Sequence, residues 1–73
     1  MEPDFSAISY IAYTFLNKTI RPLEVLKSNA GWYIGCKSEN GDPIARDSVS
    51  YYPSLYQARA VLTACSWTQR RTP

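Results

Sequence analysis

The clearest pattern of apolar and polar positions in this chain runs through residues 55–65. Apolar side chains recur there every three or four residues, at Leu55, Ala58, Val61, Leu62 and Cys65. This spacing places them on one face of an α-helix, with polar residues outside that face. Ser54 is a favoured N-cap, and Gln57 three residues later completes a capping box. The pattern predicts a helix that packs through one face and ends near residues 65–66.

A period of two residues marks residues 31–37. This alternation is typical of a strand with one face towards the core and the other towards solvent or a partner. The first set is Trp32, Ile34 and Cys36, and the second is Tyr33, Gly35 and Lys37. Asn40-Gly41 follows and predicts a tight turn of type I′. The stretch therefore indicates a β-hairpin.

The hairpin needs a return strand, which we expect over residues 44–52. Asp47 and Ser48 interrupt it and mark either a bulge or a break. Another strand is expected over residues 19–27, before the hairpin. Pro22 lies inside this stretch and cannot donate to a ladder, so the strand either is an edge or begins after the proline.

Residues 8–16 are compatible with two structures. Helical spacing relates the apolar side chains of Phe5, Ile8, Ile11, Ala12 and Phe15. The run of aromatic and β-branched residues from Tyr10 to Phe15 instead favours a strand, which is the interpretation that we prefer. A reversal at residues 17–18 would then lead into the next strand.

These elements predict an α+β fold: a small antiparallel sheet of three or four strands with one C-terminal helix packed on one face. The 73 residues form a single small domain. We expect a flexible arm at residues 1–7, an α+β core at 8–66 and a basic tail at 67–73. A chain of this length buries only about 60% of its unfolded surface, so its core is thin.

Ligands for a metal or a disulfide are scarce. The chain has no histidine, and its two cysteines, Cys36 and Cys65, are far apart. We therefore expect no metal and no cofactor. A disulfide between the two cysteines is geometrically allowed, but free thiols fit better with the acidic start of the chain, which is unlike a secretory signal. The expected location is the cytoplasm, and no apolar run approaches the ~20 residues of a membrane span.

Catalysis has few candidate groups. Without histidine, neither cysteine has an obvious base beside it. Asp42 lies next to the predicted turn, where aspartate is common, and Asp47 is expected to form a surface ion pair with Arg46. We therefore expect a protein that is not an enzyme.

Charge and aromatic content point to binding. Eight basic and six acidic residues give a net charge of +2, which is little for a dedicated nucleic-acid binder. Six tyrosines and two tryptophans exceed what a thin core can hold, so several rings should reach the surface, as they do at interfaces. The candidate partner-binding residues are Tyr33, Arg46, Tyr51, Tyr52, Trp67, Arg70 and Arg71.

Three kinds of partner fit these residues. The first is another protein, with a homodimer or higher oligomer as one version. The second is nucleic acid, contacted by the arginines at phosphates and by the rings through stacking. The third is a nucleotide-like ligand held between the subunits of an oligomer.

A set of short motifs runs from residue 20 onward. They are Leu23-x-Val25, Gly31-Trp32-Tyr33-Ile34-Gly35, Gly41-x-Pro43, Arg46-x-Ser48 and Tyr51-Tyr52. In these motifs the chain resembles small proteins carried by phages and prophages of enteric bacteria, and more faintly the ββα modules of the YegP-like type. The resemblance implies an accessory gene product acting in the host cell. The expected function is therefore that of a small, non-enzymatic phage or mobile-element protein that binds and modulates a host protein, with inhibition as the expected effect.

Overall fold

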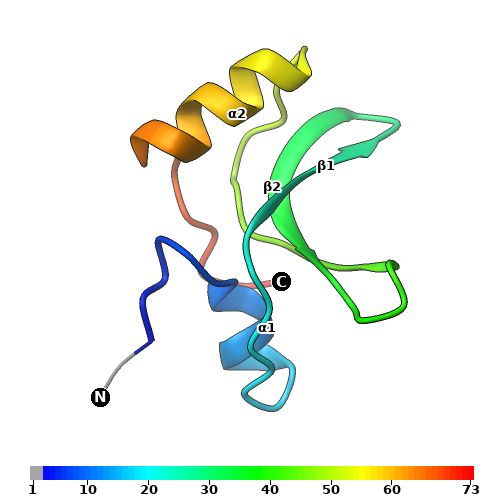
Figure 1. Cartoon of the computed structure of the whole chain (residues 1–73), viewed down its shortest axis with the longest axis vertical. Helices are drawn as coiled ribbons and strands as arrows, with labels where there is room; N and C mark the ends of the chain where they lie inside the picture. The colour runs from blue at the N-terminus through cyan, green and yellow to red at the C-terminus, as the bar shows by residue number, and fades with distance from the viewer. Residues whose placement is uncertain (1–2) are drawn as a thin grey trace.

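The computed structural model describes residues 3–73; residues 1 and 2 of the predicted arm lie outside this range. Three antiparallel strands form one sheet in the order β1-β2-β3, and the C-terminal helix α2 packs against β1 and β2 (Figure 1). A short helix, α1, lies at the opposite end of the molecule. The α+β prediction is confirmed. The elements are α1 (Tyr10–Phe15), β1 (Glu24–Ser28), β2 (Gly31–Lys37), β3 (Pro43–Arg46) and α2 (Leu55–Ala64).

The strand predicted at residues 8–16 is wrong, because the chain forms α1 there. The side chain of Ser9 caps the helix by accepting the N–H of Ala12 at 3.0 Å. Strand propensity is a weak preference, and a satisfied N-cap with burial of Ile11 outweighs it here. The predicted reversal is confirmed, since Asn17 and Lys18 both adopt left-handed backbone angles that stop the helix.

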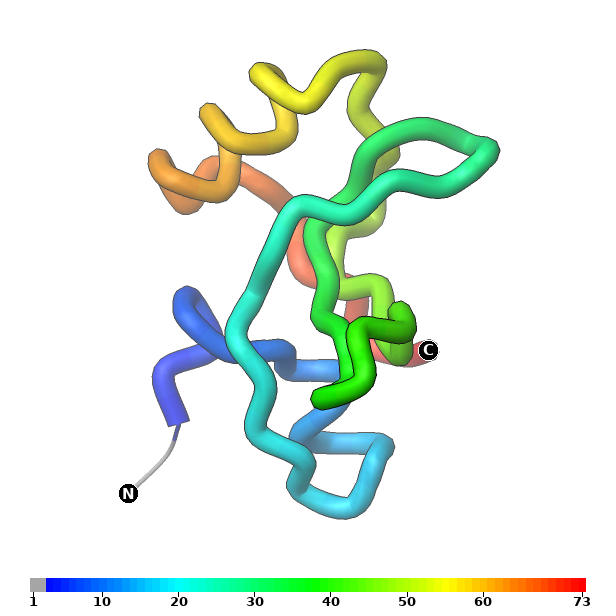
Figure 2. Tube along the Cα trace, turned by 45° about the vertical axis from the view of Figure 1, so that its right-hand side comes forward, coloured from blue at the N-terminus to red at the C-terminus, as the bar shows by residue number. Residues whose placement is uncertain are grey.

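Pro22 is accommodated in an isolated antiparallel bridge opposite Ile8, where the two chain segments lie side by side (Figure 2). The hydrogen bonds on either side of this pair come from other residues. The N–H of Ser9 donates to the carbonyl of Arg21, and that of Leu23 donates to the carbonyl of Ala7. Proline therefore lies where no donor is needed. Strand β1 begins after it, as one of the two predicted alternatives stated.

The turn between β2 and β3 differs from the predicted type I′. The N–H of Gly41 donates to the carbonyl of Ser38 at 3.0 Å, and the N–H of Ser38 donates to the carbonyl of Asp42 at 2.8 Å. Gly41 has a φ of +90°, but Asn40 does not have a positive φ. This is the three-residue hairpin loop, in which a type I turn precedes a left-handed glycine.

The expected interruption of the return strand is confirmed. Strand β3 ends at Arg46, and the N–H groups of Asp47 and Ser48 both donate to the carbonyl of Ile34, at 2.7 and 2.9 Å. Two residues thus oppose one, which is the geometry of a bulge. The chain rejoins β2 at Tyr52, which exchanges two backbone hydrogen bonds with Trp32.

The middle of strand β2 is covered on both faces, which corrects the expected exposure of Tyr33 and Gly35, while Lys37 is partly exposed as expected. Tyr33 is only 7% exposed, and Gly35 is buried. A Cβ atom at Gly35 would lie 2.1 Å from the carbonyl oxygen of Ala45, so the backbone of β3 occupies the space that a side chain would need. The buried apolar residues are Ile11, Ala12, Leu26, Tyr33, Ile34, Cys36 and Ala58.

Helix α2 begins as predicted, with the hydroxyl of Ser54 accepting the N–H of Gln57 at 3.1 Å. It ends at a left-handed Cys65, whose φ is 53°. Cys65 is exposed, so its expected place on the apolar face is wrong. Both cysteines are free, and Cys36 is buried whereas Cys65 is exposed. No helix within residues 3–73 is long and apolar enough to cross a membrane.

Candidate partner-binding surface

A buried carboxylate, that of Asp47, fixes the segment that carries the candidate surface. The expected surface ion pair between Asp47 and Arg46 is wrong, because Asp47 is 0% exposed. Its carboxylate accepts the hydroxyl of Ser9 at 2.6 Å and the N–H of Ile11 at 3.0 Å. It also accepts the side-chain amide of Gln69 at 2.8 Å. Three donors therefore satisfy the buried charge and hold α1 against the end of β3.

Residues 68–70, which we expected to belong to a tail, run antiparallel to residues 47–49. The N–H of Val49 donates to the carbonyl of Thr68 at 2.9 Å, and the N–H of Arg70 donates to the carbonyl of Asp47 at 2.6 Å. Ser48 and Gln69 form the bridge between these bonds. The C-terminal residues therefore brace the segment that follows β3 and bring Arg70 close to Arg46.

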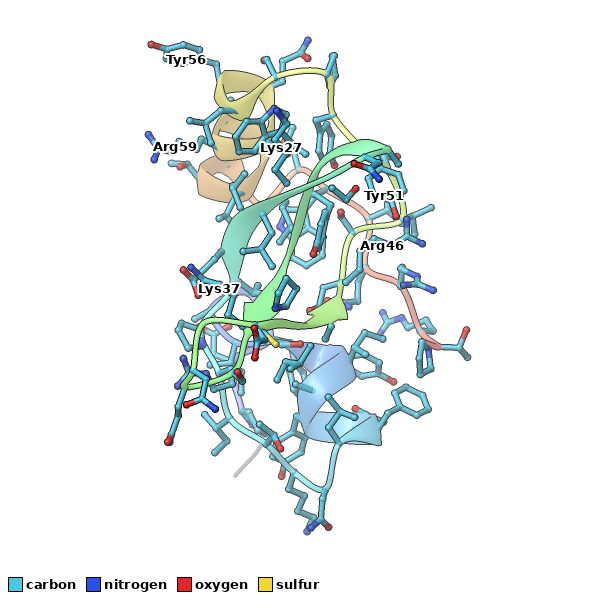
Figure 3. The ribbon with its side chains drawn as sticks, turned by 90° about the vertical axis from the view of Figure 1, so that its right-hand side faces the viewer. Lys27, Lys37, Arg46, Tyr51, Tyr56 and Arg59 are labelled. Atoms are coloured by element: carbon cyan, nitrogen blue, oxygen red, sulfur yellow. The ribbon has the colours of Figure 1, made fainter. Side chains whose placement is uncertain are left out.

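A stack of three side chains forms the centre of the candidate surface. The guanidinium of Arg46 lies 4.5 Å from the ring centre of Tyr51. The Tyr51 ring meets Tyr33 edge-on, with ring centres 5.9 Å apart and planes at 78°. Figure 3 shows Arg46 and Tyr51 close together. Tyr51 is 40% exposed and Tyr33 is 7% exposed, so the stack runs from the surface into the core. A fourth predicted residue joins it, since Nη1 of Arg70 donates to the carbonyl of Arg46 at 3.3 Å.

Charge and burial differ along this stack. Burial raises the pKa of the Tyr33 hydroxyl, and the neighbouring Tyr51 raises it further. Within residues 3–73 the one ion pair joins Lys37 to Glu24 at 3.5 Å. Arg46 and Arg70 therefore have no carboxylate of the described chain within 4 Å. Their positive charge is available to an acidic partner.

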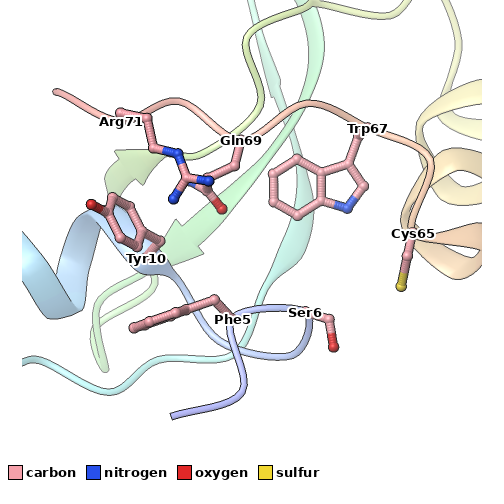
Figure 4. A pocket seen from close by; sticks show the side chains of 7 residues that line it. All are labelled: Phe5, Ser6, Tyr10, Cys65, Trp67, Gln69 and Arg71. Atoms are coloured by element: carbon pink, nitrogen blue, oxygen red, sulfur yellow. The ribbon is translucent and has the colours of Figure 1, made fainter. Parts of the chain in front are cut away.

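The other three predicted residues lie elsewhere. Tyr52 is half-buried beside Trp32, and burial raises the pKa of its hydroxyl. Trp67 and Arg71 line a pocket on a different part of the surface, where the Arg71 guanidinium lies 5.2 Å from the ring centre of Tyr10 (Figure 4). The structure therefore groups four of the seven residues, pairs two others at the pocket and leaves Tyr52 by itself.

Several exposed apolar residues were missed by the sequence analysis. Val49, two residues before Tyr51, is 51% exposed, and its position inside a predicted strand concealed this. Phe15, the last residue of α1, is 42% exposed, and Ile20, five residues later, is 64% exposed. The assignment of residues 8–16 to a strand concealed the exposure of Phe15, and Ile20 was concealed by its position in the strand predicted over residues 19–27.

The site offers binding groups and little chemistry. No three His, Cys, Asp or Glu side chains among residues 3–73 are arranged to hold a metal ion. Burial raises the pKa of the Cys36 thiol, which keeps it protonated and unreactive near neutral pH. Comparison with protein-family models, curated proteins and solved structures finds no match to this chain. What the protein does must therefore be argued from its own surface.

Proposed function

We propose that this protein is a small, non-enzymatic accessory protein of a phage or mobile element that binds a host protein and inhibits it. The contact surface is the face formed by Arg46, Tyr51 and Arg70, which we call the Arg46–Tyr51 face. One observation carries the proposal: an exposed tyrosine is held between an arginine and a buried second ring.

This arrangement suits recognition because the side chains are already ordered. Tyrosine and arginine contribute most of the energy at many interfaces, and they contribute more when little rotamer freedom is lost on binding. Tyr33 fixes the ring of Tyr51 from beneath, and Tyr51 in turn positions the guanidinium of Arg46. The conformational entropy of these side chains is therefore largely lost on folding, and little remains to be lost on binding.

The chemistry of the face indicates an acidic partner with an apolar centre. Arg46 and Arg70 supply positive charge without a carboxylate partner in the described chain. Tyr51, which is 40% exposed, supplies apolar area beside the Arg46 guanidinium. The resemblance to phage-borne proteins supports a partner from the host cell, the cytoplasm being the compartment where the two would meet.

The proposal is tested by capturing the partner with tagged protein from an enteric-bacterial lysate. Wild type should recover one stoichiometric protein, and its affinity for the purified partner should fall by about 30-fold in Arg46→Ala or Tyr51→Ala, as for typical hot-spot residues. Arg59→Ala is the matched control, because Arg59 is an exposed arginine on α2, away from this face (Figure 3). Equal binding by all three variants would contradict the proposal.

Nucleic acid is the second candidate partner. It is favoured by the lack of carboxylates near Arg46, Arg70 and Arg71, combined with the rings of Tyr51 and Tyr10 beside two of them. Three phosphate contacts on a single strand would give a slope of about −2 in log K against log salt. Absence of binding to single-stranded DNA and RNA at low salt removes this candidate, whatever the outcome of the protein capture.

A further inference from the structure

A pocket lies between the N-terminal segment, the start of α1 and the residues that follow α2 (Figure 4). Its volume is about 210 Å³. A cavity of about 150 Å³ is known to accept one benzene ring, so this pocket has room for one ring and a small substituent. None of its lining residues belongs to the Arg46–Tyr51 face. The pocket is therefore a separate site.

Two groups of aromatic side chains line the pocket: the Phe5–Tyr10 pair and Trp67. Phe5 packs edge-on against Tyr10, with ring centres 5.2 Å apart, and also contacts Tyr13 at 5.6 Å. Trp67 also lines the pocket but pairs with no other ring of residues 3–73. A flat ligand between them would contact the fixed pair on one side and Trp67 on the other. Aromatic rings gain from such contacts beyond simple burial.

Arg71 and Gln69 lie at one end of the pocket, whereas Ser6 lines another part of it (Figure 4). The guanidinium of Arg71 lies over Tyr10 and points towards the open space (Figure 4). Arg71 has no carboxylate of residues 3–73 within 4 Å. The amide nitrogen of Gln69 is already bonded to Asp47 and to the carbonyl of Arg70, which leaves the side-chain oxygen of Gln69 as an acceptor. This end therefore offers one positive charge and one acceptor.

We propose that this pocket binds one aromatic ring that carries a carboxylate. The ring lies between Trp67 and the Phe5–Tyr10 pair, and the carboxylate pairs with Arg71. A single guanidinium matches a singly charged carboxylate, to which it can donate two parallel hydrogen bonds. Two sources supply this chemistry: a free aromatic carboxylic acid, or the C-terminal aromatic residue of a peptide, whose amide N–H would donate to Gln69.

The reactivity of the Cys65 thiol reports whether a ligand occupies the pocket, because Cys65 lines the pocket and is exposed. Cys36 is buried and serves as the internal control. We would measure by mass spectrometry the rate at which iodoacetamide alkylates Cys65 in the full chain. 3-Phenylpropionate at ten times its dissociation constant should slow this rate by about tenfold. Unmodified Cys36 in the same spectrum shows that the protein stays folded.

Variants and ligand analogues make the test specific. Arg71→Gln should abolish the protection, and Arg59→Gln should leave it unchanged. 3-Phenylpropanamide, which has the ring without the charge, should protect at least several-fold less. The proposal is overturned if the acid does not slow alkylation, if the amide protects equally, or if Arg71→Gln is protected like wild type.

The two sources are separated by acetyl-Gly-Phe with a free carboxylate and the same peptide with an amidated end. Protection by the free-carboxylate peptide at a tenfold lower concentration than 3-phenylpropionate would assign the pocket to protein C-termini. Protection by 3-phenylpropionate with no effect of either peptide would assign it to small carboxylic acids. Either result supports the shared chemistry, and neither depends on the Arg46–Tyr51 face.

Discussion

Arg46 and Asp47 are neighbours in the chain and lie in two regions of opposite character. The guanidinium of Arg46 packs on Tyr51 at the surface, whereas the carboxylate of Asp47 is fully buried among donors from α1 and the C-terminal residues. Each charge is stabilised, but by a ring in one case and by three hydrogen bonds in the other. Charge by itself therefore does not decide which side of this domain a residue occupies.

The two regions also differ in what they contribute, one to stability and the other to binding. The buried region joins segments far apart in sequence, since Ser9 and Gln69 both reach Asp47. A thin apolar core cannot hold such segments by burial alone, and a fully satisfied polar network adds the missing specificity. The surface region is held by contacts that are partly exposed, so its exposed residues can change with little loss of stability. We expect stability to depend on the first region and binding on the second.

The largest effect is expected from Asp47→Ala. Removing the carboxylate leaves the donors of Ser9, Ile11 and Gln69 without their acceptor, two of them in the interior. The free energy of unfolding should fall by about 3–5 kcal/mol, measured by urea denaturation. Asp42→Ala, at an exposed position, is the control and should cost under about 0.5 kcal/mol. Similar losses in the two variants would abolish the distinction between the regions.

A smaller loss is expected from Gly35→Ala, at the join between β2 and β3. The added Cβ would lie 2.1 Å from the carbonyl oxygen of Ala45, so the two strands must separate. Overpacking of this kind costs about 1–3 kcal/mol. Gly41→Ala is the comparison. Gly41 has open space around it, so an added Cβ would be strained only by the positive φ of +90°. Urea denaturation of both should show the greater loss at Gly35.

Alkaline pH should reduce the stability that depends on the buried side chains of Tyr33 and Cys36. Burial raises the pKa of Cys36 above its usual 9.0 and that of Tyr33 above its usual 10.0. The fold favours both neutral forms, so their contribution to stability is complete below about pH 9 and is lost as pH rises through the two raised values. The urea concentration at the midpoint of unfolding should therefore decrease as the pH is raised from 8 to 11. In Tyr33→Phe this fall should be smaller; an unchanged fall would show that Tyr33 does not contribute.

The smallest effect on stability is expected from Arg46→Ala, although it should weaken partner binding by about 30-fold. Its contact with the Tyr51 ring is partly exposed and is worth about 0.5–1 kcal/mol. Thermal unfolding of this variant should therefore resemble that of wild type. A loss comparable with that of Asp47→Ala would mean that the Arg46–Tyr51 face is part of the structural core.

Local sequence signals predicted several features well. Ser54 was identified as the cap of α2 because capping needs only residues three apart. The interruption at Asp47-Ser48 was visible because polar residues break an apolar alternation. The strand expected at residues 8–16 was wrong because its cap, Ser9, is itself held by a residue 38 positions later. Propensity at short range cannot include such a partner.

The sequence by itself determined the α+β class, the helix at the C-terminal end, the hairpin and the residue types available for binding. Tertiary structure alone decided which of those residues meet. It buried Asp47 and Tyr33, placed Arg46, Tyr51 and Arg70 together, and moved Trp67 and Arg71 to a separate pocket. The physical reason is that periodicity and capping depend on neighbours within a few residues. Burial and side-chain contacts instead depend on segments brought together only when the whole chain has folded.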